Sequence, residues 1–281
     1  MSREPVVVAA IQLCSSNDWM TNAAEIDARL AQAARAGARL AVLPENMAAF
    51  GPDAVPTLTP RWRELRDWLA GRARAHGLWL VGGTLPVPER PDGTPVPGRV
   101  RSVTWVFSDQ GDVVGRYDKC HLFDVEVADA QGSYRESATF EPGEGPVLIP
   151  TPWGGLGVLT CYDLRFGEQA RLLRAAGAEL LVVPAAFTAM TGEAHWQVLL
   201  RARAIETQCL VIGAGQGGRH SAQRETWGHS QVIDAWGRVL AEQAESGPGI
   251  VTAVWDRDEQ AALRRRMPLQ SHQRPLPMQP S

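Results

Sequence analysis

The chain has 281 residues, of which 44% are hydrophobic and 21% charged, ordinary values for a globular protein. Its net charge of −3 gives no sign of a nucleic acid or an anionic membrane as partner, and no apolar run is long enough to span a bilayer. The N-terminal residues carry an acidic residue and a proline before the first apolar run, which is not typical of a signal peptide. The four cysteines are widely spaced without a Cys-x-x-Cys pair, which predicts reduced thiols, no zinc site and a cytoplasmic location.

The first third of the chain alternates between short apolar runs and amphipathic stretches. Apolar runs of this length predict buried strands, and apolar residues three and four positions apart predict helices. Pro60 and Gly77 mark the two ends of the second helix, because proline favours the first helical turn and glycine the position after the last. This order predicts an α/β fold. The predicted elements are strands at 6–13, 39–44 and 78–84 and helices at 22–38 and 60–77.

The second half of the chain repeats features of the first. Residues 102–118 predict a β-hairpin with a glycine in its turn, followed by a loop at 119–146 that is rich in Gly, Pro and acidic residues. Three later segments resemble three earlier ones in the same order: 177–185 resembles 37–45, 209–215 resembles 78–84, and 232–242 resembles 106–117. We therefore expect two related halves that each supply one sheet with helices outside, packed as a four-layer α-β-β-α sandwich.

No low-complexity linker separates the halves, so we expect a single domain over residues 1–281 with its core at about 5–265. The proline-rich segment 266–281 is predicted to be extended. The basic run Arg264–Arg266 lies near the end of a predicted helix, where positive charge complements the helix dipole. That explanation suits the overall charge balance better than nucleic-acid binding does.

Two reactive side chains occur where predicted strands end, which is the edge where α/β folds place catalytic groups. Cys161 ends an apolar run and precedes a helical pattern, so backbone N–H groups and the helix dipole could stabilise its thiolate. The alternative is a buried structural cysteine. Glu45 follows the strand at 39–44, and its counterpart in the second half is Ala185. A solvated loop glutamate is the alternative there, but the asymmetry between the halves favours a functional carboxylate.

Lys119 is the only lysine of the chain, although Lys and Arg together number 28. Chance is one explanation. The other is that this position needs a compact ammonium, whose pKa responds to burial, and not a planar guanidinium. A nucleophilic thiol also needs a base and a group that neutralises an oxyanion. None of the six histidines lies in a context typical of cysteine proteases, so a carboxylate beside a lysine is the alternative.

Three stretches around these residues resemble motifs of the nitrilase superfamily of carbon–nitrogen hydrolases: LPEN at 43–46, YDKCHLFD at 117–124 and LTCYDLRF at 159–166. The resemblance covers about residues 5–275 and implies the same α-β-β-α sandwich.

This resemblance also implies roles for individual residues. Glu45 would be the general base that activates the nucleophile Cys161. Lys119 would stabilise the tetrahedral intermediate together with the backbone N–H of Tyr162. Glu136 would orient Lys119 and the attacking water. Two nearby glutamates fit that last role less well because Pro and Gly surround them in a turn; they are Glu141 and Glu144.

Segments 184–209, 228–242 and 263–275 resemble the branch of the superfamily that acts on deaminated glutathione. That resemblance implies hydrolysis of the amide to 2-oxoglutarate and cysteinylglycine through a cysteine thioester, as a metabolite-repair reaction without a metal or other cofactor. An ω-amidase acting on 2-oxoglutaramate and an N-carbamoyl amino acid hydrolase are alternatives from the same superfamily. A catalytically idle scaffold or binding protein is an alternative from another class, and the intact set of four polar residues argues against it.

A small 2-oxo acid amide as substrate requires a fixed cation near the nucleophile. Arg165 follows Cys161 closely, and its guanidinium could bind a carboxylate with two hydrogen bonds. The alternative is a structural ion pair with Glu168. The resemblance places Phe187 against the substrate chain and Thr191 at its keto-acid end, although both could instead pack within a loop. It also implies a homodimer or a larger homo-oligomer.

Overall fold

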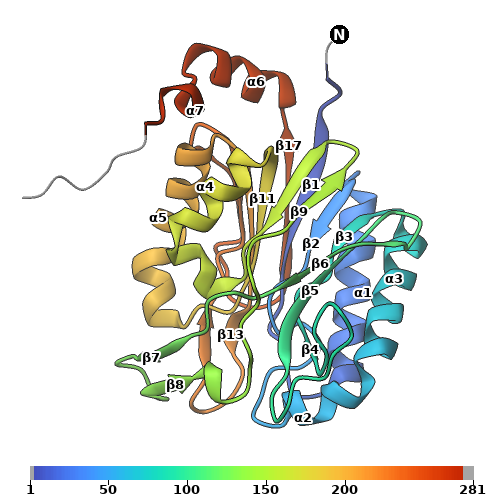
Figure 1. Ribbon diagram of the computed structural model, residues 1–281. Coiled ribbons are helices and arrows are strands. Elements are labelled where there is room, and N and C mark those ends of the chain that lie inside the picture. The colour runs from blue at the N-terminus through green and yellow to red at the C-terminus, as the bar shows by residue number, and fades with distance from the viewer. Residues whose placement is uncertain (1–2, 275–281) are drawn as a thin grey trace, which may run out of the picture.

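Two β-sheets pack face to face in the computed structural model, which describes residues 3–274 (Figure 1). The first sheet has the strand order β17-β1-β2-β3-β5-β4, with β6 paired to β5. The second has the order β16-β15-β12-β11-β10-β9. The strands of the first sheet are β1 (Val6–Gln12), β2 (Leu40–Val42), β3 (Trp79–Val81), β4 (Leu85–Val87), β5 (Arg101–Phe107), β6 (Val113–Asp118) and β17 (Gly249–Trp255). Those of the second are β9 (Leu148–Thr151), β10 (Gly154–Val158), β11 (Ala178–Ala185), β12 (Leu210–Gly215), β15 (Gln231–Ile233) and β16 (Val239–Glu242).

Helices cover the outer face of each sheet (Figure 1). The first sheet carries α1 (Trp19–Arg35) and α3 (Trp62–His76), and the second carries α4 (Gly167–Ala175) and α5 (Ala189–Thr207). Further helical segments are α2 (Ala54–Leu58), η1 (Thr59–Arg61), α6 (Arg257–Arg266) and α7 (Leu269–His272). No helix within residues 3–274 is long and apolar enough to cross a membrane.

Three apolar clusters hold these layers together. One lies between the first sheet and α1 and α3, one between the two sheets, and one between the second sheet and α4 and α5. The middle cluster takes alternate residues of both sheets, such as Val8, Leu40, Leu156 and Leu180, because side chains alternate between the faces of a strand. This arrangement confirms the predicted α-β-β-α sandwich.

The helix limits follow from local chemistry. The carboxylate of Asp18 accepts a hydrogen bond from the backbone N–H of Thr21 at 2.8 Å and so caps α1, which therefore begins at Trp19, three residues before the predicted start. Gly77 ends α3 in the left-handed conformation, with φ of 63°, as its position predicted.

The structure corrects three expectations. The halves do not each supply one complete sheet, because β17, near the end of the chain, pairs antiparallel with β1 from Val6↔Trp255 to Gln12↔Gly249. The predicted loop at 119–146 contains a small hairpin of β7 (Asp124–Glu126) and β8 (Ser133–Arg135), followed by the short helix η2 (Glu136–Ala138). The segment 266–281, expected to be extended, contains α7, and its residues 275–281 lie outside the described part.

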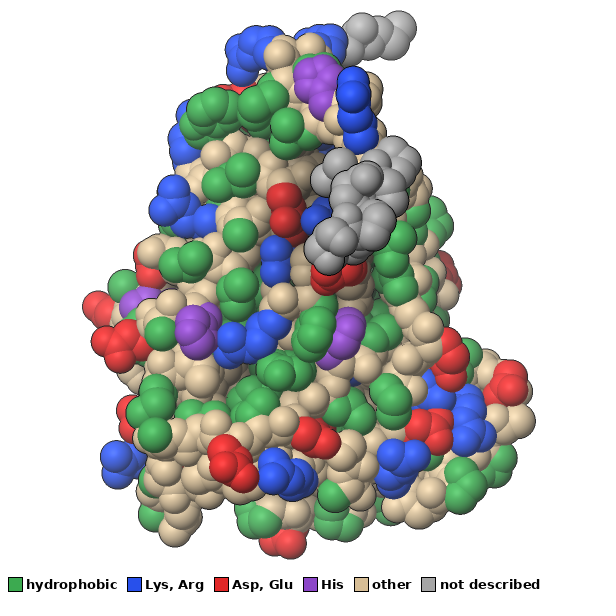
Figure 2. Space-filling view, turned by 60° about the vertical axis from the view of Figure 1, so that its left-hand side comes forward, with side chains coloured by type: hydrophobic (Ala, Val, Ile, Leu, Met, Phe, Trp, Pro, Cys, Tyr) green, Lys and Arg blue, Asp and Glu red, His purple; other side chains and the backbone are tan. Residues whose placement is uncertain are grey.

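Hydrophobic side chains also reach the surface over the second sheet's helices. Figure 2 shows the face on which α4 and α5 lie, where such side chains occur between charged ones. The large hydrophobic residues of α4 and α5 with 40% or more of their surface exposed are Leu172, Met190, Val198 and Ile205.

Candidate active site

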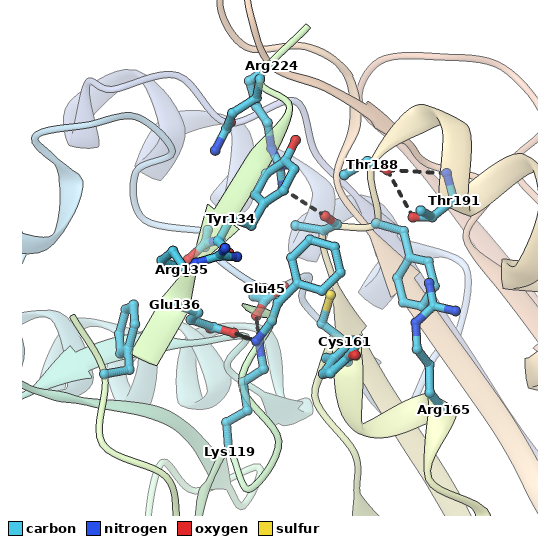
Figure 3. Close-up of a pocket in the computed structure, with 17 residues that line it drawn as sticks. Glu45, Lys119, Tyr134, Arg135, Glu136, Cys161, Arg165, Thr188, Thr191 and Arg224 are labelled. Atoms are coloured by element: carbon cyan, nitrogen blue, oxygen red, sulfur yellow. Dashed lines mark hydrogen bonds and ion pairs between the residues drawn. The ribbon is translucent and has the colours of Figure 1, made fainter. Parts of the chain in front are cut away.

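The four residues predicted to carry the chemistry lie together at the carboxyl ends of strands from both sheets (Figure 3). Glu45 follows β2, Lys119 directly follows β6, and Glu136 begins η2 after β8. Cys161 begins the short helix η3 (Cys161–Arg165) after β10. All four line one cavity of about 240 Å³. One water molecule occupies ~30 Å³ in the liquid, so the cavity has room for a substrate of several heavy atoms.

Lys119 is held between two carboxylates. Its Nζ donates to Glu45 Oε1 at 2.9 Å and to Glu136 Oε1 and Oε2 at 2.8 and 2.9 Å. Burial alone would lower the pKa of Lys119, whose side chain is 2% exposed, but Glu136 and Glu45 raise that pKa well above its usual value. The side chain is therefore a fixed ammonium.

The Glu136 carboxylate accepts hydrogen bonds from a backbone N–H as well as from Lys119. Its Oε2 also accepts the backbone N–H of Phe123 at 2.7 Å. Burial raises the pKa of the Glu136 carboxyl; Lys119 lowers that pKa and the negative charge of Glu45 raises it, and the net change is upward. Glu136 thus has a higher proton affinity than a solvated glutamate.

Cys161 sits in a strained turn beside these groups. Its φ of 50° lies in the left-handed region, which is unfavourable for a residue with a side chain and is held by the surrounding structure. Burial and the negative charge of Glu45 raise the pKa of the thiol well above its usual value; Lys119 and the backbone N–H of Ala186 act in the opposite direction. The thiol therefore keeps its proton at neutral pH and has the Glu45 carboxylate as an adjacent base. Tyr162 occupies the second position of η3, where a backbone N–H has no partner within the helix.

Asp163 fixes the turn of Cys161 to the segment that carries Lys119. This carboxylate is fully buried and accepts four hydrogen bonds. The donors are Thr160 N at 2.9 Å, Tyr117 Oη at 2.6 Å, His121 N at 2.9 Å and His121 Nδ1 at 2.8 Å. Because Tyr117 and His121 flank Lys119, one side chain sets the distance between the nucleophile and the ammonium. No sequence pattern predicts this role for Asp163, because its partners are brought to it only by the fold.

The three predicted substrate-binding residues line the same cavity. The guanidinium carbon of Arg165 lies 5.1 Å from the ring centre of Phe187, and Arg165 Nη1 lies 3.1 Å from His195 Nδ1. Glu168, the alternative ion-pair partner of Arg165, instead lies 3.7 Å from Arg171. No carboxylate of residues 3–274 is within 4.0 Å of the Arg165 guanidinium, which leaves it able to bind one from a ligand.

Thr191 and Phe187 also have structural contacts. The Thr191 hydroxyl lies 2.9 Å from that of Thr188, which caps α5. Phe187 packs against Trp196, with ring centres 5.0 Å apart. Neither contact closes the cavity to which both residues contribute.

Several cavity residues were not found from the sequence. Most of them come from the β7–β8 hairpin and from the turn between β13 (Gly217–Arg219) and β14 (Glu225–Trp227), two loops far apart in the chain, while Asn46 follows Glu45 and Thr188 caps α5. No sequence pattern marks the residues of the two loops, because their position depends on how the loops meet. The missed residues with polar side chains are Asn46, Gln131, Tyr134, Arg135, Thr188 and Arg224.

No group of three or more His, Cys, Asp or Glu side chains in residues 3–274 is placed to hold a metal ion. The four cysteines are unpaired thiols.

Comparison with known proteins identifies the family. A family model described as carbon-nitrogen hydrolase matches residues 7–265. The chain is 41% identical over 277 residues to the deaminated glutathione amidase of Yersinia enterocolitica, covering 95% of this chain and 92% of that one. The structure of the NitFhit protein of C. elegans superposes with a TM-score of 0.86 at 32% identity, covering 98% of this chain and 66% of that one.

An amidase from Nesterenkonia sp. AN1 superposes with a TM-score of 0.77 at 26% identity, covering 95% of this chain and 99% of that one. Its structure shows covalent addition of the acetamide moiety of fluoroacetamide at the active site cysteine. With a matching family model over nearly its whole length and the sandwich fold, the chain belongs to the carbon-nitrogen hydrolase family, the nitrilase superfamily, and is a hydrolase of carbon–nitrogen bonds.

Proposed function

We propose that the protein is an amidase that hydrolyses the amide bond of deaminated glutathione to 2-oxoglutarate and cysteinylglycine, through a thioester on Cys161. The observation that carries the mechanism is the Lys119 ammonium held at 2.8–2.9 Å between Glu45 and Glu136 beside the thiol. The substrate follows from the 41% identity to an amidase of that name and from the arginine without a carboxylate partner in the cavity.

In the first step, Cys161 Sγ attacks the amide carbonyl carbon while its proton passes to Glu45. The carbonyl oxygen becomes an oxyanion, which accepts hydrogen bonds from Lys119 Nζ and the backbone N–H of Tyr162. Lys119 Nζ donates to both carboxylate oxygens of Glu136 before substrate binds. The substrate oxygen therefore replaces one of these two oxygens as the acceptor. Protonated Glu45 then gives its proton to the leaving nitrogen, the C–N bond breaks, and a thioester remains on Cys161.

In the second step, water hydrolyses the thioester. Glu45 takes one proton from the water as its oxygen attacks the thioester carbon, and Glu136 holds Lys119 in place to stabilise the second oxyanion. The C–S bond breaks, the sulfur recovers the proton from Glu45, and the acid leaves. Two protonation cycles of one carboxylate therefore complete the reaction without an external acid or base.

Recognition of the acyl half fits the remaining cavity residues. Arg165 would bind the carboxylate of the 2-oxo acid with its fork of N–H groups, Phe187 would pack against the methylene chain, and the Thr191 hydroxyl would donate to the keto-acid end. We further propose that the protein acts in the cytoplasm as a metabolite-repair enzyme. The exposed hydrophobic residues over α4 and α5 support a homodimer or larger homo-oligomer.

The test compares kcat/KM for deaminated glutathione, 2-oxoglutaramate, an N-carbamoyl amino acid and a simple aliphatic amide. Deaminated glutathione should be the best substrate of the four, and a higher value for 2-oxoglutaramate would assign the protein as an ω-amidase. Arg165→Ala should lower kcat/KM for both 2-oxo acid amides by about 30-fold or more, the loss of a charge-assisted contact, and leave the simple amide little changed. An equal loss on all substrates would remove Arg165 from substrate recognition.

A further inference from the structure

Two arginines besides Arg165 line the cavity: Arg135, which pairs with Glu126 at 3.6 Å, and Arg224, which lies across from Arg165. Arg224 precedes β14 and reaches the cavity beside Tyr134, whereas Arg165 follows Cys161 on the other side of the sulfur (Figure 3). The two residues come from different loops, and nothing in the reaction steps or in acyl recognition uses Arg224.

The Arg224 guanidinium is held in place by contacts that leave its charge uncompensated. Its Nη2 donates to the backbone oxygen of Ala186 at 3.2 Å. Its Cζ lies 4.7 Å from the ring centre of Tyr134 and 5.2 Å from that of Phe50, and cations bind favourably over such rings. Its Nη1 is buried without a hydrogen-bond partner.

No carboxylate in the described part of the chain is within ion-pair distance of this guanidinium. Asp129 is near enough for Arg224 to help lower the pKa of that carboxyl. Asp129 is already occupied, however, because it accepts Tyr134 Oη at 2.7 Å and the backbone N–H groups of Gly132 and Gln131 at 2.9 and 3.1 Å. A guanidinium that lines a cavity and has no carboxylate partner is placed to bind an anionic group of a ligand.

The position of the two carboxylates shows which half of a substrate faces Arg224. Glu45 and Glu136 lie on the same side of Cys161 as Tyr134 and Arg224, and Arg165 lies on the other (Figure 3). An amide nitrogen must receive a proton before it can leave, so the amine half extends toward the carboxylate that supplies that proton. The acyl half then extends toward Arg165.

We infer that Arg224 is a specificity-determining residue that binds an anionic group on the leaving amine, such as the terminal carboxylate of a short peptide. This inference rests on the proposed function and extends it: the substrate class is amides with a carboxylate on each side of the scissile bond. An amine half that carries a carboxylate supplies the negative charge that the Arg224 guanidinium lacks, and ammonia as leaving group does not.

The experiment measures kcat/KM for three substrates with the same acyl half. They are deaminated glutathione, its analogue with a carboxamide in place of the terminal carboxylate, and 2-oxoglutaramate. The wild type should prefer the free acid over the carboxamide. Arg224→Gln should lower kcat/KM for the free acid by about 10- to 100-fold and change the other two by no more than about 2-fold.

Two further variants separate recognition from structure. Arg224→Lys should recover part of the preference for the free acid. Arg219→Gln removes the same charge from β13 at an exposed position, 3.7 Å from Glu225, and should match the wild type on all three substrates.

The outcomes are distinguishable. An equal loss on all three substrates in Arg224→Gln would overturn the inference and assign Arg224 to supporting Ala186, with the proposed function intact. A wild type that does not distinguish acid from carboxamide would also overturn the inference alone. A wild type that turns over none of the three would overturn the proposed function and the inference together.

Discussion

The two sheets are built alike but end differently. β1 pairs with β2 at Val8↔Leu40, and β10 pairs with β11 at Leu156↔Leu180. Leu13 lies as far beyond Val8 as Cys161 lies beyond Leu156, so the nucleophile of the second sheet has a buried leucine as its counterpart in the first. By the same comparison, Glu45 at the end of β2 corresponds to Ala185 at the end of β11.

Protein atoms fill the space beyond the end of β1, whereas the active-site cavity lies beyond the end of β10. The fully buried Gln12 side chain donates to the backbone oxygens of Glu245 at 2.8 Å and Gly247 at 2.9 Å, and accepts Ser230 N at 3.0 Å. A Cβ on Gly217 or on Gly228 would fall within 2.9 Å of this amide, so both positions need glycine. The end of β1 is therefore packed with neutral groups whose hydrogen bonds are satisfied. The end of β10 instead faces a cavity lined by charged groups, where a reaction can take place.

The comparison predicts the largest effect at the open end. Cys161→Ala removes the nucleophile, so turnover should fall by on the order of 10⁴-fold or more, measured as amide hydrolysis at saturating substrate. Cys14→Ala, beside the counterpart Leu13, should keep near wild-type activity. Mass spectrometry with a slow substrate should place the acyl adduct on Cys161. An adduct on Cys120, whose pKa burial raises to about 11, would contradict the assignment.

A second variant keeps the charge but changes its shape. Lys119→Arg should lower kcat by about 10²-fold or more, because a guanidinium cannot direct one donor at the oxyanion from the space between Glu45 and Glu136. Arg116→Lys, a reverse exchange on the preceding strand β6 at an ion pair with Asp118, serves as the control and should have little effect. Near wild-type turnover by Lys119→Arg would remove the ammonium from catalysis.

A third variant tests the filled end. Gln12→Ala leaves buried partners such as Ser230 N–H without their acceptor, so the free energy of unfolding should fall by about 2–3 kcal/mol. Urea denaturation measures this loss. Turnover per folded molecule should be unchanged, because this end takes no part in the reaction. A comparable fall in kcat would contradict this comparison, since it would show that the end of β1 also contributes to the reaction.

The smallest effect concerns pH. Ion pairs hold the loop after Lys119 in place. Arg90 and, with a smaller effect, Arg101 donate hydrogen bonds to Glu141 and lower the pKa of its carboxyl to about 2. A pKa below the unfolded value stabilises the fold above pH ~4.3, and this contribution is lost as the pH falls toward 2.

Glu141→Gln should therefore lower the free energy of unfolding by about 1 kcal/mol at pH 7, and the difference from wild type should shrink below pH ~4.3. The loss caused by Gln12→Ala should stay constant over the same range, because no titrating group is involved. Urea denaturation at pH 7 and pH 3 checks both. A Glu141→Gln difference independent of pH would show that the carboxylate's charge does not hold this loop.

Much of the fold could be predicted because apolar runs and helix caps act locally. The limits of α3 followed from Pro60 and Gly77, and the two-sheet arrangement followed from repeated segments. The pairing of β17 with β1 could not be predicted, since it joins residues from opposite ends of the sequence. The hairpin β7–β8 was missed because its strands are short and lie in a stretch rich in turn-forming residues.

Some residues of the candidate site could likewise be predicted from the sequence, and others could not. Glu45, Lys119 and Cys161 could be predicted because each lies in a recognisable family motif, and Glu136 because the resemblance implies a glutamate between the lysine and the cysteine. Asp163 and Arg224 were not, because their importance depends on partners such as His121 and Tyr134 that only the folded loops bring near. The motifs also do not show the charge states: burial keeps the proton on the Cys161 thiol, and the carboxylates of Glu136 and Glu45 keep the charge on the Lys119 ammonium.

The position of β17 has a consequence for how the protein is made. During synthesis β1 leaves the ribosome long before its hydrogen-bonding partner at Gly249–Trp255. The nascent chain therefore carries an exposed strand edge while the residues between the two strands are made, and such edges pair readily with other chains. A product truncated before residue 249 would keep that edge permanently, so we expect shortened chains to aggregate even with every residue of the reactive cavity in place.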